Sequence, residues 1–197
     1  MPRDPVEELG RLALDPVGFS RGLLAHDPWP IQAQILSAVA ERHRVAVKAC
    51  HSSGKTFTAA DAVLWWTSRY EDGIVITTAP TWTQVEKLLW GHVHQAARTG
   101  SLGLPPLLKT ALNLGPENYA LGLSTNEGVR FQGWHGRILI VLDEAPGVLP
   151  EIWEAIEGIR AGGDVHVLAL GQPALLGGPF YDAFHAQRAS WATITIS

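Results

Sequence analysis

One short segment, residues 49–56 with the sequence ACHSSGKT, constrains the fold of this chain more than any other. It follows the apolar run 45–47 and precedes an alanine-rich stretch that predicts a helix. A strand, a glycine-containing loop and then a helix form the layout of a phosphate-binding loop, in which backbone N–H groups converge on an anion. Lys55 would add a full charge at the β- and γ-phosphates, and the Thr56 hydroxyl would bind Mg²⁺.

The segment departs from the general phosphate-loop motif at its first position, where Ala49 replaces glycine. The predicted strand before it and the predicted helix after it supply the structural context that the motif requires. We therefore take the loop and the start of the following helix as candidate nucleotide-binding residues, namely His51, Ser52, Ser53, Gly54, Lys55, Thr56 and Phe57.

A second motif lies further along the chain, where the apolar run 138–142 (ILIVL) is followed by Asp143 and Glu144. A run without polar residues is typical of a central parallel strand that is buried on both faces. Ligands of open α/β sheets bind at the carboxyl ends of such strands. We expect Asp143 to hold Mg²⁺, directly or through water, and Glu144 to orient and deprotonate an attacking water molecule.

Composition further limits the classes of protein to which the chain could belong. The chain has 197 residues, 46% of them hydrophobic, and a net charge of -4, so it lacks the basic balance typical of nucleic-acid-binding domains. Any DNA contact must therefore be local. Cys50 is the only cysteine, which excludes a disulfide within the chain and is typical of a reducing cytoplasm. The sequence contains neither a signal-peptide core nor an apolar run long enough for a membrane span.

The alternation of apolar and helix-forming segments predicts an α/β fold with a parallel sheet. Together with the phosphate-loop and acidic motifs, it indicates a P-loop NTPase of the additional-strand (ASCE, RecA/helicase-like) type. Its mainly parallel central sheet would be flanked by helices on both faces. We expect a helical extension over 1–26 and an ATPase domain over 27–197. Within the domain we expect an irregular segment over 99–117, a hairpin of strands 118–123 and 128–132, and a helix over 178–190. Of the adjacent Trp65 and Trp66, one should point away from the core.

This set of motifs resembles the ATPase domain of the large terminase subunit, the DNA-packaging motor of tailed phages, from about residue 27 to 197. Residues 28–32 (PWPIQ) resemble the adenine-binding motif of that family, which implies that Gln32 bonds the adenine edge and that Trp29 packs near the base. Terminase phosphate loops often lack the first glycine, as at Ala49. Many carry an arginine inside the loop, whereas this chain has CHSS at 50–53.

Two further segments carry the resemblance. Residues 130–137 (RFQGWHGR) precede the acidic pair, and the resemblance makes Arg130 and Arg137 candidate arginine fingers that could act from a neighbouring subunit. Residues 170–173 (LGQP) match a Gly-polar-Pro element that couples nucleotide state to movement. Gln172 stands where the family more often has asparagine, and its amide could sense the γ-phosphate or position water.

The resemblance implies a function as well as a fold. ATP and Mg²⁺ would be the cofactors, and hydrolysis would drive double-stranded DNA into a procapsid through a homo-oligomeric ring on the portal protein, together with the small terminase subunit. The place of action would be the cytoplasm of the infected host cell, without a membrane. Phage terminases usually carry a C-terminal nuclease domain, and residues 1–197 supply no such site. We therefore expect that domain to be missing from this chain.

Three alternatives remain open. A DNA helicase or other translocase would share Gln32, the phosphate loop and the acidic pair, but would need a second motor domain. A nucleotide-binding assembly module that barely hydrolyses ATP is disfavoured by Glu144. A small-molecule kinase is disfavoured by the Gln32 segment and by the pairing of Asp143 with Glu144.

Overall fold

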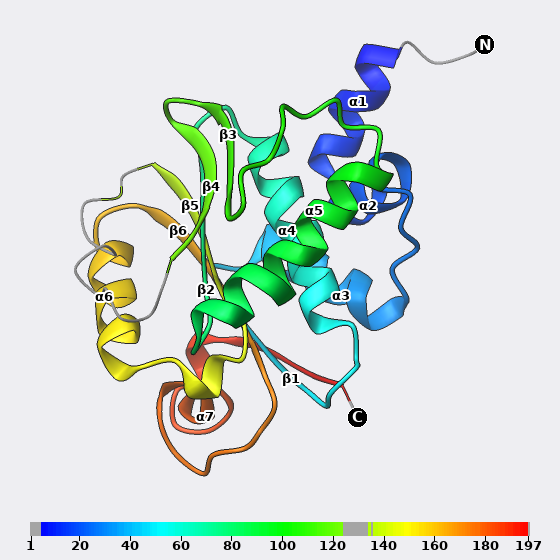
Figure 1. Cartoon of the computed structure of the whole chain (residues 1–197). Coiled ribbons are helices and arrows are strands. Elements are labelled where there is room, and N and C mark those ends of the chain that lie inside the picture. Colours follow the sequence, from blue (N-terminus) through cyan, green and yellow to red (C-terminus); the bar gives the residue numbers. More distant parts are fainter. Residues whose placement is uncertain (1–4, 124–133, 135, 197) are drawn as a thin grey trace.

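A computed structural model describes residues 5–123, 134 and 136–196, and within them seven strands form one sheet in the order β3-β4-β2-β5-β6-β1-β7 (Figure 1). Neighbouring strands are parallel, except that β3 runs antiparallel to β4. The strands are β1 (Arg44–Ala49), β2 (Gly73–Thr78), β3 (Ala111–Gly115), β4 (Asn118–Gly122), β5 (Arg137–Leu142), β6 (Asp164–Gly171) and β7 (Ala192–Ile196).

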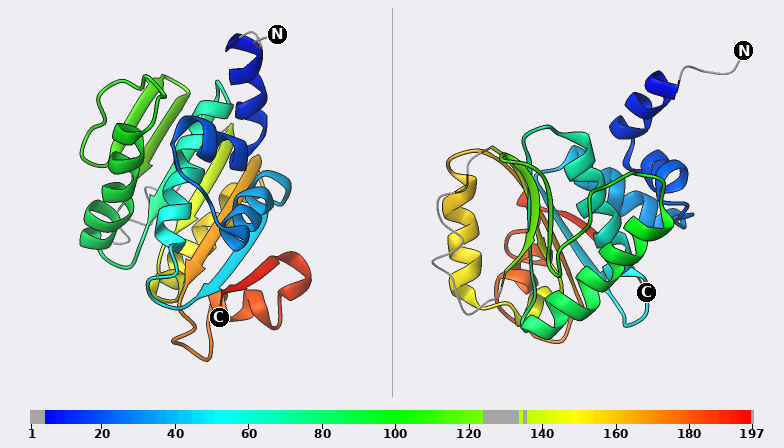
Figure 2. Two further views of the ribbon diagram at one scale, coloured as in Figure 1. Left: turned by 90° about the vertical axis from the view of Figure 1, so that its right-hand side faces the viewer. Right: turned by 45° about the horizontal axis from the view of Figure 1, so that its top comes forward.

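Helices cover both faces of the sheet, as Figure 2 shows. On one face lie α2 (Pro16–Leu23), α3 (Pro30–Glu41), α4 (Lys55–Arg69) and α5 (Trp90–Thr99), the last preceded by a π-helical turn at Gln84–Leu89, while α1 (Pro5–Leu14) packs against α2 and α4. On the other face lie α6 (Pro150–Arg160) and α7 (Pro179–Phe184). The predicted α/β architecture, with a mainly parallel sheet between two helical layers, is confirmed.

The central strands are apolar because they are buried on both faces, as the sequence predicts. Strand β5 lies between β2 and β6, and five of its six residues are buried because both of its faces are covered by helices. The sheet therefore separates two apolar cores, one beneath α2–α5 and one beneath α6 and α7. This layering places the carboxyl ends of the parallel strands together at one edge of the sheet.

The outermost strands at the β3 side of the sheet differ from the prediction. The segment 99–117 was expected to be irregular, but it contains β3, which pairs with β4 as a hairpin. Leu112 is buried, and the Asn118 side chain donates hydrogen bonds to the carbonyls of Thr67 and Tyr70, so contacts with α4 hold this hairpin in place. The strand predicted at 128–132 lies outside the described residues.

Two other local predictions are wrong. The helix expected over 178–190 ends at Phe184, because His185 leaves the helical region, and a short 3₁₀ turn at Arg188–Ser190 then leads into β7. Trp65 and Trp66 are both buried, since α4 is enclosed on two sides. The indole of Trp66 donates to the carbonyl of Arg137 on β5, and that of Trp65 donates to the carbonyl of Ala13 on α1.

The described helices include none that is both long enough and apolar enough to cross a membrane.

The backbone of Gly171, at the end of β6, packs closely against the side chain of Pro146. A Cβ atom on Gly171 would overlap the ring of Pro146, with its Cγ at 2.9 Å, in the turn that follows β5. We expect Gly171→Ala to destabilise the fold by about 1–3 kcal/mol, the usual cost of overpacking. Urea unfolding should measure this loss.

The matched control is Gly158→Ala in α6, where a Cβ atom would meet nothing within 4 Å. That variant should be neutral or more stable by about 0.5 kcal/mol, because alanine favours a helix over glycine. Equal effects of the two substitutions on the free energy of unfolding would contradict the proposed steric contact.

Candidate functional site

The loop between β1 and α4 has the backbone of an anion-binding turn. Ser52 and Gly54 have φ values of 58° and 75°, and Gly54 immediately precedes the first residue of α4. The carbonyl of Gly54 accepts hydrogen bonds from both the backbone N–H and the hydroxyl of Thr58, at 3.0 Å each. The N–H groups of the first turn of α4 have no partners within the helix and carry its positive dipole end. An anion is therefore the ligand that this turn favours.

The side chains of the loop differ in exposure. His51 and Ser52 are exposed, whereas the Ser53 hydroxyl oxygen is buried and has no hydrogen-bond partner in the described part of the chain. A buried polar atom of this kind usually has a partner in proteins. A phosphate oxygen bound in the loop would supply one, so the residues present fit a phosphate group.

Helix α4 carries Lys55 to the end of β5. The Lys55 Nζ atom lies 3.0 Å from Oε1 of Glu144, and the two side chains are 6% and 26% exposed. Glu144 has a φ of 50°, a left-handed conformation that is uncommon outside glycine and that often occurs at functional sites. The ammonium group predicted to bind phosphates and the carboxylate predicted to activate water are thus in contact.

Thr56 makes the second contact between the two motifs. Its hydroxyl donates to Oδ2 of Asp143 at 3.0 Å, and the backbone N–H of Glu144 donates to Oδ1 at 3.1 Å. Asp143 is 1% exposed, and burial raises the pKa of its carboxyl to about 6, although the hydrogen bond from Thr56 opposes this shift. A hydroxyl oxygen beside a carboxylate is a donor set that fits Mg²⁺.

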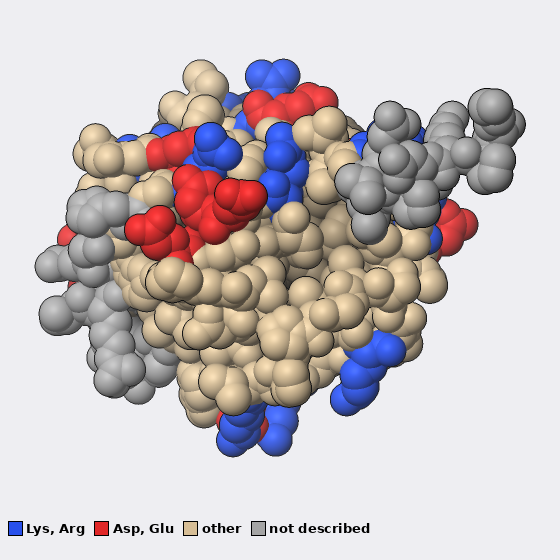
Figure 3. Space-filling view, turned by 90° about the horizontal axis from the view of Figure 1, so that it is seen from above, with Lys and Arg blue, Asp and Glu red and all other residues tan. Residues whose placement is uncertain are grey.

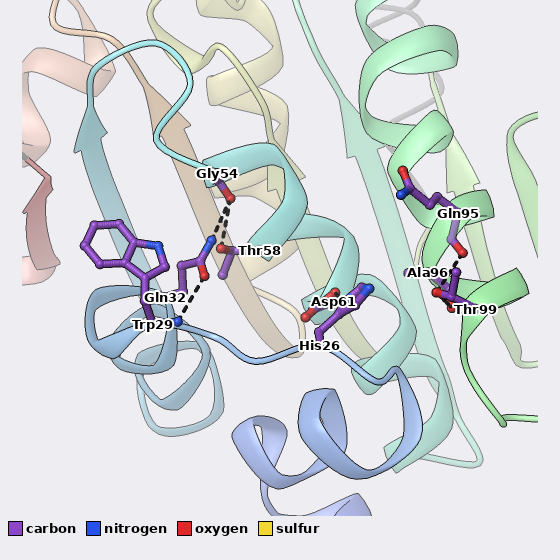
Figure 4. Close-up of polar contacts among 9 residues, drawn as sticks. All are labelled: His26, Trp29, Gln32, Gly54, Thr58, Asp61, Gln95, Ala96 and Thr99. Atoms are coloured by element: carbon purple, nitrogen blue, oxygen red, sulfur yellow. Dashed lines mark hydrogen bonds and ion pairs between the residues drawn. The ribbon is translucent and has the colours of Figure 1, made fainter.

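Gln32 ties the segment before β1 to the phosphate loop (Figure 4). Its Oε1 accepts from the backbone N–H of Trp29 at 3.2 Å, and its Nε2 donates to the carbonyl of Gly54 at 3.4 Å. Both ends of the Gln32 amide are therefore engaged within the chain. The Trp29 side chain is 47% exposed and leaves a flat apolar surface beside this amide.

Sequence reasoning missed an ion pair that anchors the same segment. The Nδ1 atom of His26 lies 2.8 Å from Oδ1 of Asp61, a buried carboxylate on α4 (Figure 4). Phe57, which was expected to contribute to nucleotide binding, packs its ring against that of His26 with the centroids 4.3 Å apart. No sequence pattern predicts that His26 contacts Asp61, because only tertiary folding brings α4 beside the linker between α2 and α3.

Gln172 follows the last residue of β6 and lies near the start of the phosphate loop. Together with residues from β1 and β7 it lines a pocket of about 370 Å³, whose lining is Lys48, Ala49, Cys50, Gln172, Pro173, Ala174, Thr195 and Ile196. The preceding Gly171 packs against Pro146, next to the acidic pair. The Gly-polar-Pro segment therefore lies between the two motifs.

Arg137, one of the two candidate arginines, does not contact this cluster. Arg137 begins β5, so it lies at the edge of the sheet opposite Asp143, about 20 Å away for a strand of this length. Its side chain makes long ion pairs with Asp72 and Asp164, at 3.9 Å each, and packs over the ring of Tyr70. Arg130 lies outside the described residues.

Comparisons with solved structures identify the fold. The large terminase ATPase domain of Thermus phage P74-26 superposes with a TM-score of 0.65 at 18% identity, covering 90% of this chain and 83% of that one. The large terminase of a second thermophilic bacteriophage gives 0.68 at 11% identity, covering 86% of this chain and 46% of that one, and it has also been solved in complex with ADP.

A more distant similarity is to Dbp5 of S. cerevisiae bound to RNA and ADP BeF3, with a TM-score of 0.52, 15% identity and coverage of 97% of this chain and 51% of that one. No protein-family model matches the sequence, and no curated protein matches it. The chain has the fold of P-loop ATPases, and the large terminase ATPase domains are among its structural neighbours.

The ion pair between His26 and Asp61 gives a pH-dependent prediction. Burial raises the pKa of Asp61, whereas His26 opposes that rise, so removal of His26 should raise the pKa further. An acid whose pKa is raised by folding destabilises the protein increasingly as pH rises above its unfolded value of 3.8. We expect His26→Ala to lower stability by about 3 kcal/mol at pH 8 and by less at pH 4.5. Urea unfolding at both pH values measures this.

The control places the same substitution in an Asp61→Asn background, where no carboxylate remains to be desolvated. There the effect of His26→Ala should be small and independent of pH. If the loss is equal at the two pH values in the parent background, the interpretation is wrong.

Proposed function

We propose that this chain is an ATP-hydrolysing motor domain of the phage large terminase type, which powers the packaging of double-stranded DNA. The observation that carries the proposal is the convergence of two motifs on one edge of the sheet. Lys55 contacts Glu144 and Thr56 contacts Asp143, at 3.0 Å in each case. The ATPase domains with the same fold support this reading.

The loop and the start of α4 would bind ATP. The backbone N–H groups of 52–56 and the Ser53 hydroxyl would face the phosphate oxygens, and Lys55 would bind the β- and γ-phosphates. Thr56 and Asp143 would hold Mg²⁺, which neutralises charge on the β- and γ-oxygens when bound. His51 and Ser52 border the phosphates at the exposed tip of the loop, and Trp29 would pack near the adenine.

The contact between Lys55 and Glu144 suggests how the site is held before nucleotide binds. The ammonium group neutralises the Glu144 carboxylate, which is partly buried. When phosphate oxygens attract Lys55, Glu144 is free to accept a proton from the water that attacks the γ-phosphorus. The bond from the γ-phosphorus to the β–γ bridging oxygen breaks, and ADP and phosphate leave. Gln172 would position that water or sense the γ-phosphate.

Completion of the site would depend on other subunits. Arg137 lies at the far edge of the sheet, so it could act as an arginine finger only on the site of a neighbouring molecule, and Arg130 is the other candidate. We include in the proposal a homo-oligomeric ring around the duplex, docked on the portal protein with the small terminase subunit, in the cytoplasm of the infected host cell. The chain spans 46% of the length of the second bacteriophage terminase, and the proposal concerns the ATPase domain alone.

A second candidate function is that of a helicase or another nucleic-acid translocase. The structural likeness to Dbp5, which was solved with RNA and a nucleotide analogue, favours it. The two candidates differ in the nucleic acid that should stimulate turnover, which is the duplex for a packaging motor and a single strand for a helicase.

Steady-state ATP hydrolysis tests the proposal through two variants. Glu144→Gln should retain ATP binding and lower kcat by at least about 100-fold, because the general base is lost. Lys55→Ala should lose ATP binding, because the charge that faces the phosphates is removed. Nucleotide binding by calorimetry separates the two effects, and Glu151→Gln in the exposed first turn of α6 serves as the control.

Double-stranded DNA should raise the parent rate more than single-stranded DNA or RNA. Normal turnover by Lys55→Ala would overturn the assignment of the phosphate loop. Stimulation by single strands alone would favour the helicase alternative.

Gln32 gives a separate test of nucleotide recognition. Because its amide already bonds Trp29 and Gly54, we expect Gln32→Ala to loosen the loop and to weaken ATP and GTP binding by the same factor. The loss of the hydrogen-bonded link between Gln32 and the loop should weaken the binding free energy by about 1 kcal/mol, or roughly fivefold in Kd. If only ATP binding weakens, Gln32 instead reads the adenine edge directly.

A further inference from the structure

Three potential metal ligands meet at the edge of the sheet opposite the phosphate loop. His43 precedes β1, and Asp164 and His166 belong to the start of β6. One ligand atom from each of the three lies within 4.8 Å of the other two. Figure 3 views this edge of the molecule, where acidic and basic side chains gather.

The two separations between Asp164 and the histidines fit metal coordination better than hydrogen bonding. Oδ1 of Asp164 lies 3.4 Å from Nε2 of His43 and 3.5 Å from Nε2 of His166. Hydrogen bonds between such groups normally have donor–acceptor distances of about 2.7–3.2 Å. Two ligands that are each about 2.0–2.1 Å from a tetrahedral zinc ion lie about 3.3 Å apart. A small displacement of each group would thus place a zinc ion between them.

His166 is held in the orientation that a ligand requires. Its Nδ1 lies 2.9 Å from the carbonyl oxygen of Val39 in α3, a partner that accepts a proton, so Nδ1 donates and Nε2 carries the free lone pair. Histidine ligands of metals usually donate their other ring N–H to a carbonyl or carboxylate in this way. The rings of His43 and Trp66 pack against the His166 ring, with centroids 4.5 and 4.9 Å away, and restrict its rotation further.

Several basic side chains lie near the cluster. The Arg137 Nε atom lies 3.9 Å from Oδ2 of Asp164, the oxygen that does not face the histidines. Arg42, Arg44 and Arg160 line a pocket together with His43. The Arg137 side chain is 48% exposed and also extends toward Asp72, so it can stay paired when Oδ1 binds a cation.

We propose that His43, Asp164 and His166 form a zinc-binding site that is distinct from the nucleotide site. Two imidazole nitrogens and one carboxylate oxygen are ligands typical of Zn²⁺, and the fourth position would hold water. The ion would fasten the turn between α3 and β1 to the start of β6, where the backbone N–H of Val167 already donates to the carbonyl of His43 at 2.8 Å.

The test measures zinc binding by the whole chain without nucleotide, so that it is independent of ATP hydrolysis. In calorimetry, chelator-treated protein should bind one Zn²⁺, and substitution of the ligands should abolish this binding. The Tm should be higher with Zn²⁺ than with chelator, because an ion bound only by the folded state stabilises it. Co²⁺ serves as a spectroscopic probe, since a four-coordinate site gives intense visible absorption bands that the hydrated ion lacks.

Two variants remove ligands that are exposed and therefore compatible with folding. His43→Gln and Asp164→Asn should each lower Zn²⁺ affinity at this site by at least about tenfold and abolish the Co²⁺ bands. His185→Gln, which changes an exposed histidine outside the cluster, is the matched control and should bind Zn²⁺ as the parent does.

Circular dichroism of each variant without metal should match that of the parent. The proposal is overturned if the parent fails to bind Zn²⁺. It is also overturned if His43→Gln and Asp164→Asn bind Zn²⁺ as tightly as the parent, because the ion would then be held elsewhere, for example by Cys50.

Discussion

The arrangement of the site depends on one contact, that between the N-terminus of α4 and the carboxyl end of β5. Strand β6 separates β1 from β5 in the sheet, so the two motifs would not meet through strand pairing. Helix α4 brings Thr56 and Lys55 across the edge of the sheet, where they contact Asp143 and Glu144. These charged and polar groups are largely buried, and each makes a hydrogen bond or ion pair that opposes the cost of its desolvation.

Close packing holds strained backbone in place around this contact. The described residues outside glycine with positive φ are Ala25, Ser52 and Glu144, and two of them belong to the candidate site. Such conformations cost about 1–3 kcal/mol each and persist only where the surrounding structure enforces them. Gly171 provides part of that enforcement, because its lack of a side chain lets the end of β6 approach Pro146. These conformations and this close packing fix the backbone of the candidate site.

The two edges of the sheet have different chemistry. The carboxyl edge gathers the phosphate loop, the acidic pair and Gln172, whereas the amino edge gathers His43, Asp164 and His166. Strands β1, β5 and β6 are parallel, so the residues that begin them lie at one edge and those that follow them lie at the other. Arg137 lies at the amino edge for the same reason, far from Asp143 and Glu144 of its own chain.

The sequence by itself determined the fold class, the central strands and the two motifs, since these depend on short patterns of apolar residues and glycine. It did not reveal β3, the end of α7 or the burial of both Trp65 and Trp66, which depend on packing between distant elements. Only the tertiary structure decided which polar groups meet. His26 pairs with Asp61, and both ends of the Gln32 amide form hydrogen bonds within the chain. The packing of the helices determines which side chains far apart in the sequence come into contact.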